Sequence, residues 1–418
     1  MRPLPYRVRL INRFILAVLL FFVCFLIGKC ISENEEPAQE SAFYTEEKKE
    51  EPEEKITEIK PLKQEEKPQA LIQEIKKENK TDSTHIFIQK NVRVALKMDN
   101  YLRAFRPDYA FYLMVDSKTN EILAWGENKE KEVQSTPDFL SRSTFPAASL
   151  IKTITVAAAL ESRLYSLNTK IPLIGNPHKL YKRQIVHSEN YKGETISLED
   201  AYAKSYNPPM AIVGYKVGAS QLKKAAFTLG FNREFKENIP NKSTFSPPEN
   251  GFALAEAASG FTEETTLSPL LAAAQIRAII TKKPLEIPYA KNLYPFAPTK
   301  PIRISNTRFS ENTYYGLQEA LKRSVTNGTA RKNISTRYIS RKNFKNLTIG
   351  CKTGTLDGTD PKGRYEWFAG YAKKKDSGES VVLIVLQIHS GATRSQPATQ
   401  VAAQLINYWA NQTSDKKE

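Results

Sequence analysis

Cysteine and histidine are scarce in this chain of 418 residues, which contains three of the first and four of the second. Cys24 and Cys30 lie in or beside an apolar N-terminal segment and Cys351 stands alone, so the sequence predicts no disulfide framework. The histidines show no spacing typical of metal ligands. The chain also lacks a glycine-rich phosphate loop and the G-x-S-x-G motif of α/β-hydrolases. These absences argue against a disulfide-stapled domain, a metalloenzyme, a nucleotide-binding protein and an α/β-hydrolase.

A long hydrophobic run is also lacking, because the charge-free stretch from Phe14 to Gly28 has 15 residues, whereas a membrane-spanning helix needs roughly 20. Apolar neighbours can extend the stretch, with Arg13 and Lys29 reaching the interface at its ends. Arginines are concentrated on the N-terminal side of this stretch, which predicts that the N-terminal end lies in the cytoplasm and everything after Lys29 outside. We therefore expect residues 1–32 to form a cytoplasmic tip and a single transmembrane signal anchor in the cytoplasmic membrane.

Two other interpretations of this N-terminal segment are weaker. A cleaved signal peptide would be followed by a small-residue A-x-A site, and no such site follows. A lipoprotein anchored through Cys30 is disfavoured because Lys29 is a poor residue just before a lipidated cysteine. The expectation is thus an uncleaved single span, with residues 33–418 on the extracytoplasmic, periplasmic side.

Charge is unevenly distributed along the chain, whose formal net charge is +16. Residues 33–80 contain 15 Glu and 9 Lys with almost no aromatics, so they cannot bury enough apolar surface to offset the entropy of ordering. We interpret residues 33–84 as a disordered Glu/Lys/Pro linker. The remainder is strongly basic, which indicates an anionic environment such as a lipid surface or a cell-wall polymer. The positive charge is dispersed and no RNA- or DNA-binding signature occurs, so nucleic acid is the weaker interpretation.

Residues 85–412 have the composition of one globular domain, followed by a charged tail at 413–418. Tyr109–Val115 and Glu121–Trp125 are predicted to form a hairpin, and an Ala- and Leu-rich helix is predicted for Leu150–Leu164. Strands at both ends around a helical middle predict a layered α+β domain, with one sheet formed from both ends and covered by helices. The remaining predicted elements are a short helix after the capping-box pattern of residues 197–200, helices over 267–280, 312–326 and 397–410, and strands over 347–355, 366–372 and 380–389.

Three short strings carry the chemistry, and the first is Ser149-Leu-Ile-Lys152. The S-x-x-K pattern also occurs at Ser220 and Ser414, so it is weak alone. Ser414 lies in the charged tail and Ser220 precedes a lysine-rich helix, whereas Ser149 stands at the predicted start of an apolar helix. Positions i and i+3 share a helix face, so Lys152 can reach the Ser149 hydroxyl. A buried lysine can lose its proton near neutral pH and then act as a base.

Ser205-Tyr-Asn207 is the second string, and its S-x-N pattern recurs in the chain, with Ser188-Glu-Asn190 as the serious rival. We prefer Ser205 because Ala-Tyr-Ala-Lys before it is a predicted helix end. Asn207-Pro-Pro209 is also expected to force a loop, which would point the Ser205 and Asn207 side chains outward.

Lys352-Thr-Gly-Thr355 is the most specific string. It ends a run of β-branched and apolar residues, so it can sit on a strand, where Gly354 lets a substrate backbone approach closely. Lys352, Thr353 and Thr355 supply a cation and hydroxyls suited to a substrate carboxylate. Taken alone, the string could equally be a strand end with a solvated lysine.

In this order, the three strings resemble the S-x-x-K, S-x-N and K-T-G motifs of the penicillin-binding protein transpeptidase family. Their separations are similar to those in the family, with 56 residues from Ser149 to Ser205 and 147 from there to Lys352. The resemblance covers about residues 109–410 and includes Gly328-Thr-Ala330 among further family-like strings. It implies a β-lactamase/transpeptidase-like fold that works without a metal or another cofactor.

The resemblance also implies roles for individual residues. Ser149 would attack the penultimate D-Ala carbonyl of a peptidoglycan stem peptide, and Lys152 would take the serine proton. Ser205 and Lys352 would relay a proton toward the leaving amine. The backbone N–H groups of Ser149 and Thr355 would form the oxyanion hole. The substrate-binding residues implied by the family are Asn207, Thr353, Gly354 and Thr355.

The implied activity is that of a peptidoglycan D,D-transpeptidase that binds β-lactam antibiotics covalently at Ser149. A D,D-carboxypeptidase and a serine β-lactamase share the acylation half and stay open as alternatives, and the non-enzymatic alternative is a β-lactam sensor. The segment before the domain resembles neither a glycosyltransferase nor a large pedestal domain, so possible cell-wall synthesis partners are left open. Cys351 stands where glycine is common in the family and is expected to be a small buried apolar residue.

Overall fold

A computed structural model describes residues 108–129, 138–291, 293, 296–304, 306–391 and 396–412. The expected anchor at 1–32, the linker at 33–84, the first residues of the expected domain at 85–107 and the tail at 413–418 lie outside these ranges. Within the described ranges, none of the helices combines the length and the apolar character needed to cross a membrane.

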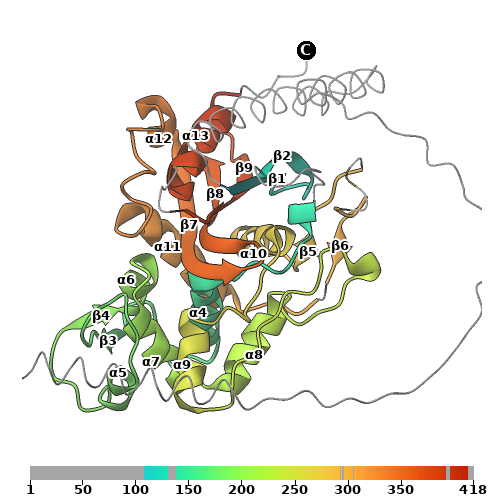
Figure 1. The fold of residues 1–418 in the computed structure, drawn as a ribbon. Helices are drawn as coiled ribbons and strands as arrows, with labels where there is room; N and C mark the ends of the chain where they lie inside the picture. The colour runs from blue at the N-terminus through green and yellow to red at the C-terminus, as the bar shows by residue number, and fades with distance from the viewer. Residues whose placement is uncertain are drawn as a thin grey trace, which may run out of the picture. The chain divides into compact units, whose positions relative to one another are not determined.

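A five-stranded antiparallel sheet forms the centre of the described domain (Figure 1). Its strand order is β2-β1-β9-β8-β7, so the N-terminal hairpin lies beside three strands from the C-terminal third. The prediction of one sheet built from both ends of the domain is therefore confirmed. The strands are β1 (Tyr109–Asp116), β2 (Ile122–Lys129), β7 (Leu347–Thr359), β8 (Lys362–Lys374) and β9 (Ser380–His389).

Helices cover both faces of this sheet, as the layered α+β prediction required. Side chains alternate between the two faces of a strand, and in β1 Phe111 joins the core that contains α10 whereas Tyr112 joins the core that contains α13. The helix α10 (Pro269–Thr281) contacts β8 and β9 on one face, and α13 (Ala398–Ala410) contacts the same two strands on the other. Because both faces are buried, β1 and β9 are apolar along nearly their whole length.

The helical middle of the chain packs beside the β7 edge of the sheet. The helix α4 (Lys152–Glu161) contacts α7, α8 and α11, and α11 (Glu311–Thr326) in turn packs on β7 (Figure 1). The other elements are α5 (Lys182–Val186), α6 (Leu198–Ala203), α7 (Asn207–Val217), α8 (Ala219–Thr228), α9 (Gly251–Ser259), α12 (Arg341–Asn346), the 3-10 turns η1 (Asp138–Leu140), η2 (Ala148–Ile151) and η3 (Lys236–Asn238), and two-stranded pairs of β3 (Lys170–Pro172) with β4 (Thr195–Ser197) and β5 (Glu286–Ile287) with β6 (Ile302–Arg303).

The start of α6 shows how the sequence sets a helix end. The Ser197 hydroxyl accepts a hydrogen bond from the Asp200 N–H at 3.1 Å, as the capping-box pattern predicted. The Asp200 carboxylate instead accepts from Arg323 of α11 at 2.7 Å and from Asn327 at 3.0 Å. Ser197 therefore caps the start of α6, and the Asp200 side chain joins this first turn to the C-terminal end of α11.

The loop predicted after Ser205 is wrong. The helix α7 begins at Asn207, with Pro208 and Pro209 in its first turn. The first N–H groups of a helix have no partner within it, so prolines fit there without losing a hydrogen bond. Asn207 is consequently buried, at 8% exposure, where an outward side chain was expected.

Candidate active site

Ser149 lies on the 3-10 turn η2, directly before α4. The turn replaces the first residues of the helix predicted from Leu150 and keeps the i, i+3 relation of the S-x-x-K string. The Lys152 ammonium donates a hydrogen bond to the Ser149 hydroxyl oxygen at 2.6 Å. The proximity expected from helical spacing is therefore present.

The backbone before Ser149 is held by close packing. Ala148 has a positive φ of 50°, a conformation that is strained for a residue with a Cβ. A Cβ on Gly260 would lie 2.1 Å from the Ala148 carbonyl oxygen, and one on Gly354 would lie 3.2 Å from the Ala148 Cβ. The Trp367 indole N–H donates to the Pro146 carbonyl at 3.0 Å and ties the same segment to β8.

Lys152 is fully buried, at 0% exposure, and has two further acceptors. Its ammonium donates to the Asn207 side-chain oxygen at 2.8 Å and to the Ser259 backbone carbonyl at 2.6 Å. Burial, and secondarily the positive charge of Lys352, hold the pKa of Lys152 well below its ordinary value. The sequence contains no signal for the Ser259 carbonyl, which lies at the end of α9, about a hundred residues further along the chain.

Lys352 is the second buried lysine, at 1% exposure, and it lies on β7. Its ammonium donates to the Ser205 hydroxyl at 2.8 Å and to the Thr353 carbonyl at 2.9 Å. Burial lowers the pKa of Lys352 to about 7, although Cys351 acts in the opposite direction. Cys351 itself is fully buried, as expected for a small apolar residue at that position.

Asn207 connects Lys152 to the segment that contains His178. Its side-chain oxygen accepts from Lys152, and its amide nitrogen donates to the His178 carbonyl at 2.9 Å. This arrangement fixes which end of the amide faces Lys152. Asn207 therefore belongs to the cluster although its predicted loop does not form.

The remaining residues of the K-T-G-T string lie on the edge strand β7. Thr353 is half-buried, Gly354 is buried and Thr355 is exposed. The Thr353 hydroxyl lies 2.6 Å from the hydroxyl of Thr329, a residue that none of the three motifs includes. Its only signal in the sequence is the family-like string Gly328-Thr-Ala330. A Cβ on Gly328 would lie 2.2 Å from the Ala203 carbonyl oxygen, which explains why this position requires glycine.

The rival motif residues lie elsewhere. The Ser188 hydroxyl donates to the Ile185 carbonyl at 2.7 Å, at the end of α5. Ser220 is exposed on α8, and Ser414 lies outside the described residues. Within the described ranges, no group of three or more His, Cys, Asp or Glu side chains is placed to hold a metal ion.

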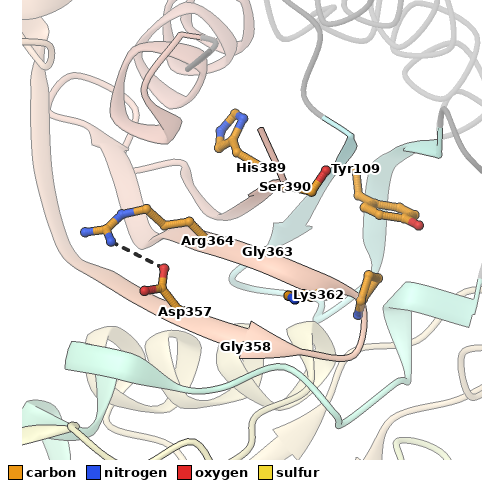
Figure 2. Close-up of a pocket in the computed structure, with 9 residues that line it drawn as sticks. Tyr109, Asp357, Gly358, Lys362, Gly363, Arg364, His389 and Ser390 are labelled. Carbon is orange, nitrogen blue, oxygen red and sulfur yellow. Dashed lines mark hydrogen bonds and ion pairs between the residues drawn. The ribbon is translucent and has the colours of Figure 1, made fainter. Parts of the chain in front are cut away.

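A hollow of about 680 Å³ lies at the other end of β7, apart from Ser149 (Figure 2). It is lined mainly by the tip of the β7–β8 hairpin and by the ends of β1 and β9. Arg364 donates to the Asp357 carboxylate beside it at 3.3 Å. The hollow thus contains charged groups, but none of the clustered serine, lysine and asparagine residues.

The cluster has the parts needed for nucleophilic acyl transfer. It places a half-buried hydroxyl beside a lysine whose pKa is lowered, and a second serine–lysine pair nearby. A lysine that is neutral at neutral pH can accept the proton of the serine hydroxyl. Threonine hydroxyls on an exposed strand edge can bind a carboxylate.

Most of the described domain matches a known protein family. The family model described as "Penicillin binding protein transpeptidase domain" matches residues 110–407. "Peptidoglycan D,D-transpeptidase PbpA" of Mycobacterium tuberculosis is 26% identical over 269 residues, which cover 60% of this chain and 51% of that protein. The protein of the same name from Mycolicibacterium smegmatis is 26% identical over 257 residues, 58% of this chain and 50% of the relative. The chain thus spans about half the length of the curated relatives it matches.

Solved structures share the fold. The penicillin G acyl-enzyme complex of penicillin-binding protein A from M. tuberculosis has a TM-score of 0.53 and 20% identity, covering 76% of this chain and 78% of that chain. The transpeptidase domain of Burkholderia pseudomallei penicillin-binding protein 3 has a TM-score of 0.56 and 17% identity, covering 79% of this chain and 96% of that one.

The Lys352 ammonium should titrate near pH 7 because burial disfavours its charged form. The measurement is a pH titration of the side-chain resonances of isotope-labelled lysine, with Lys352 assigned by its loss in Lys352→Arg. Free lysine in the same buffer serves as the reference, with its ordinary pKa of roughly 10.4. If the Lys352 resonance titrates together with that of free lysine, burial does not control the charge of this site.

Proposed function

The chain belongs to the penicillin-binding protein transpeptidase family, and we propose that it is a serine-type peptidoglycan D,D-transpeptidase that works through an acyl-enzyme on Ser149. The observation that carries this proposal is the 2.6 Å hydrogen bond from a fully buried Lys152 to the Ser149 hydroxyl. The homologous PbpA proteins, which are named for the same activity, support it.

In the acylation step, neutral Lys152 takes the hydroxyl proton as the Ser149 oxygen attacks the penultimate D-Ala carbonyl of a stem peptide. A tetrahedral intermediate forms, and the backbone N–H groups of Ser149 and Thr355 stabilise its oxyanion. The bond to the terminal D-Ala then breaks. Its amine leaves with the proton that Lys152 took, relayed through the Ser205 hydroxyl and the Lys352 amine, which lie 2.8 Å apart, so Lys152 is neutral again in the acyl-enzyme.

Substrate orientation follows from the same residues. The terminal carboxylate binds at Thr353, Thr355 and Lys352, and Asn207 holds a peptide amide. Because the scissile carbonyl lies at Ser149, beside Gly354, the preceding residues of the donor run along β7 toward the hollow of Figure 2. Among the described strands, none pairs with the outer edge of β7, so this edge can bind an extended peptide.

The acyl-enzyme is resolved by an amine from a neighbouring stem peptide. A β-lactamase needs a positioned base to activate water, and the class A signature Glu-x-x-Leu-Asn does not occur between Ser205 and Lys352. Neutral Lys152 is suited to activate an amine instead. A D,D-carboxypeptidase shares these residues and is the second candidate, because water can replace the amine in the same position.

We assign the protein to the cytoplasmic membrane, with its catalytic domain on the extracytoplasmic side. This assignment rests on the arginine-rich tip and the apolar run of residues 1–32. Protease added to spheroplasts should remove the domain of residues 85–412 while leaving a cytoplasmic control protein intact. Full protection of the domain in spheroplasts, with cleavage only after lysis, would contradict the assignment.

A labelled penicillin should form an adduct on Ser149 that persists for many minutes, because no recognisable base is left to drive its hydrolysis. Ser149→Ala should abolish the adduct, since it removes the hydroxyl that the fully buried Lys152 contacts. The matched control is Ser220→Ala, which alters another S-x-x-K serine, exposed on α8, and should label normally.

Intact-protein and peptide mass spectrometry measure the adduct and its site. Rapid recovery of free enzyme would identify a β-lactamase. With a donor peptide and an amine acceptor supplied together, a cross-linked product supports the transpeptidase, whereas release of D-Ala without acceptor incorporation supports the carboxypeptidase. An adduct that survives Ser149→Ala would refute the assignment of the nucleophile.

A further inference from the structure

The segment between α11 and β7 carries a surface of positive charge that the proposed chemistry does not use. Residues 327–346 contain no Asp or Glu. Six arginine and lysine side chains of this segment are exposed, and together they are called the basic surface here. Its members are Arg331, Lys332, Arg337, Arg341, Lys342 and Lys345.

The charge of the basic surface is not neutralised within the described part of the chain. None of its six side chains forms an ion pair there, in contrast to Lys322 of the adjoining α11, which pairs with Glu319. The carboxylate of Asp376 lies near the end of α12, where it accepts from the Asn346 amide at 2.7 Å and from the Ser377 N–H. Six unpaired cations in one segment create a field that attracts a polyanion.

The basic surface begins beside the candidate active site. Arg331 and Lys332 follow Thr329, whose hydroxyl lies 2.6 Å from that of Thr353. The Thr329 N–H also donates to the Ala203 carbonyl at 3.1 Å, two residues before Ser205. The first two cations are therefore attached to backbone that borders the carboxylate-binding end of the site.

The far end of the basic surface is carried by α12, which packs against the sheet. The helix α12 contacts β7, and the Asn343 amide donates to the Asn407 and Asn411 side-chain oxygens on and after α13, at 2.8 Å each. In Figure 1, α12 lies beside α13 and above α11, at the β7 side of the sheet. The backbone that carries Arg341, Lys342 and Lys345 is thus packed against β7 and α13.

The position of the basic surface matches the side of the site from which the acceptor, one of the two substrates of a transpeptidase, would approach. Residues of the donor that precede the scissile bond run from Ser149 toward the β7–β8 tip, in the direction opposite to Thr353. The acceptor amine must attack the acyl carbonyl from the side that the leaving D-Ala has vacated, which is the Thr353 and Thr329 side. Arg331 and Lys332 follow Thr329 by two and three residues, so an acceptor strand on this side of the site comes near the backbone that carries them.

Resting on the proposed function, we propose that the basic surface binds the acceptor: an uncross-linked peptidoglycan strand whose stem peptides carry free carboxylates. A polymer with repeated carboxylates can contact several of the cations at once, so individually weak surface contacts add up. The continuity of the surface with the active site favours this substrate over a lipid surface, which would require no connection to Thr329.

The test uses the full-length chain in detergent, a short thioester donor, and soluble uncross-linked peptidoglycan strands as acceptor. Arg331→Glu with Lys332→Glu should raise the KM for the strands by about five-fold or more, because attraction becomes repulsion. The rate of penicillin acylation at Ser149 should stay within about two-fold of the wild type. Arg341→Glu with Lys342→Glu should act in the same direction, and added salt should weaken wild-type strand binding more than that of either variant.

The matched control reverses two exposed lysines between β5 and β6, Lys291→Glu with Lys300→Glu. An equal rise in KM in this control overturns the proposal, because net charge alone would then explain the effect. An unchanged KM in the variants of the basic surface also overturns the proposal. Binding of the same variants to vesicles of anionic lipid is measured in parallel, and a loss of binding to the vesicles but not to the strands overturns it as well. If penicillin fails to acylate Ser149 in the wild type, the proposed function fails instead, so the two failures are distinguishable.

Discussion

The active site depends on the burial of two lysines without a counter-ion. Lys152 and Lys352 are at most 1% exposed, and neither pairs with a carboxylate among the described residues. Removing an ammonium group from water disfavours its charged form, and at Lys152 the charge of Lys352 adds repulsion. Both pKa values are consequently lowered, that of Lys352 to about 7. A neutral amine beside a serine hydroxyl is what the proposed acyl transfer requires.

The rest of the domain serves to keep these groups buried and close together. The sheet presents Lys352 on its edge strand, α4 presents Lys152, and the end of α9 provides the Ser259 carbonyl that accepts from Lys152. The close approach of these elements requires glycine at positions 260 and 354, where a Cβ would press on the backbone or side chain of Ala148. Strain at Ala148 is thus retained because the surrounding packing leaves it no alternative.

Much of the fold and site could be predicted because their signals are local. The strand β9 was predicted with its observed bounds, and α11 within one residue of its start, because apolar patterning and turn residues mark their ends. The Ser149–Lys152 contact follows from helical spacing alone. The resemblance of the three strings, in this order, to the family motifs predicted that the strings lie together in the fold. The spacing within each string could not predict this.

What the sequence could not predict depends on contacts between distant segments. The Ser259 carbonyl is a backbone group, so no residue type marks it, and Thr329 has a role only because α11 places it against Thr353. The wrong loop at Asn207 arose because two prolines indicate a break but also fit the first turn of a helix. The basic surface was not predicted, because the positive charge is dispersed along the sequence and only the fold places this segment beside Thr353.

The measurement that tests the account most directly is the pH dependence of Ser149 acylation by penicillin, as a second-order rate constant. Since only neutral Lys152 accepts the serine proton, the rate should rise with pH and level off well below 10.5, the ordinary lysine value. Lys152→Arg, which keeps a permanent positive charge, should lose nearly all of the rate across this range. A rise that follows the ordinary lysine pKa, or an Arg variant that retains the rate, would contradict the claim that burial makes Lys152 the base.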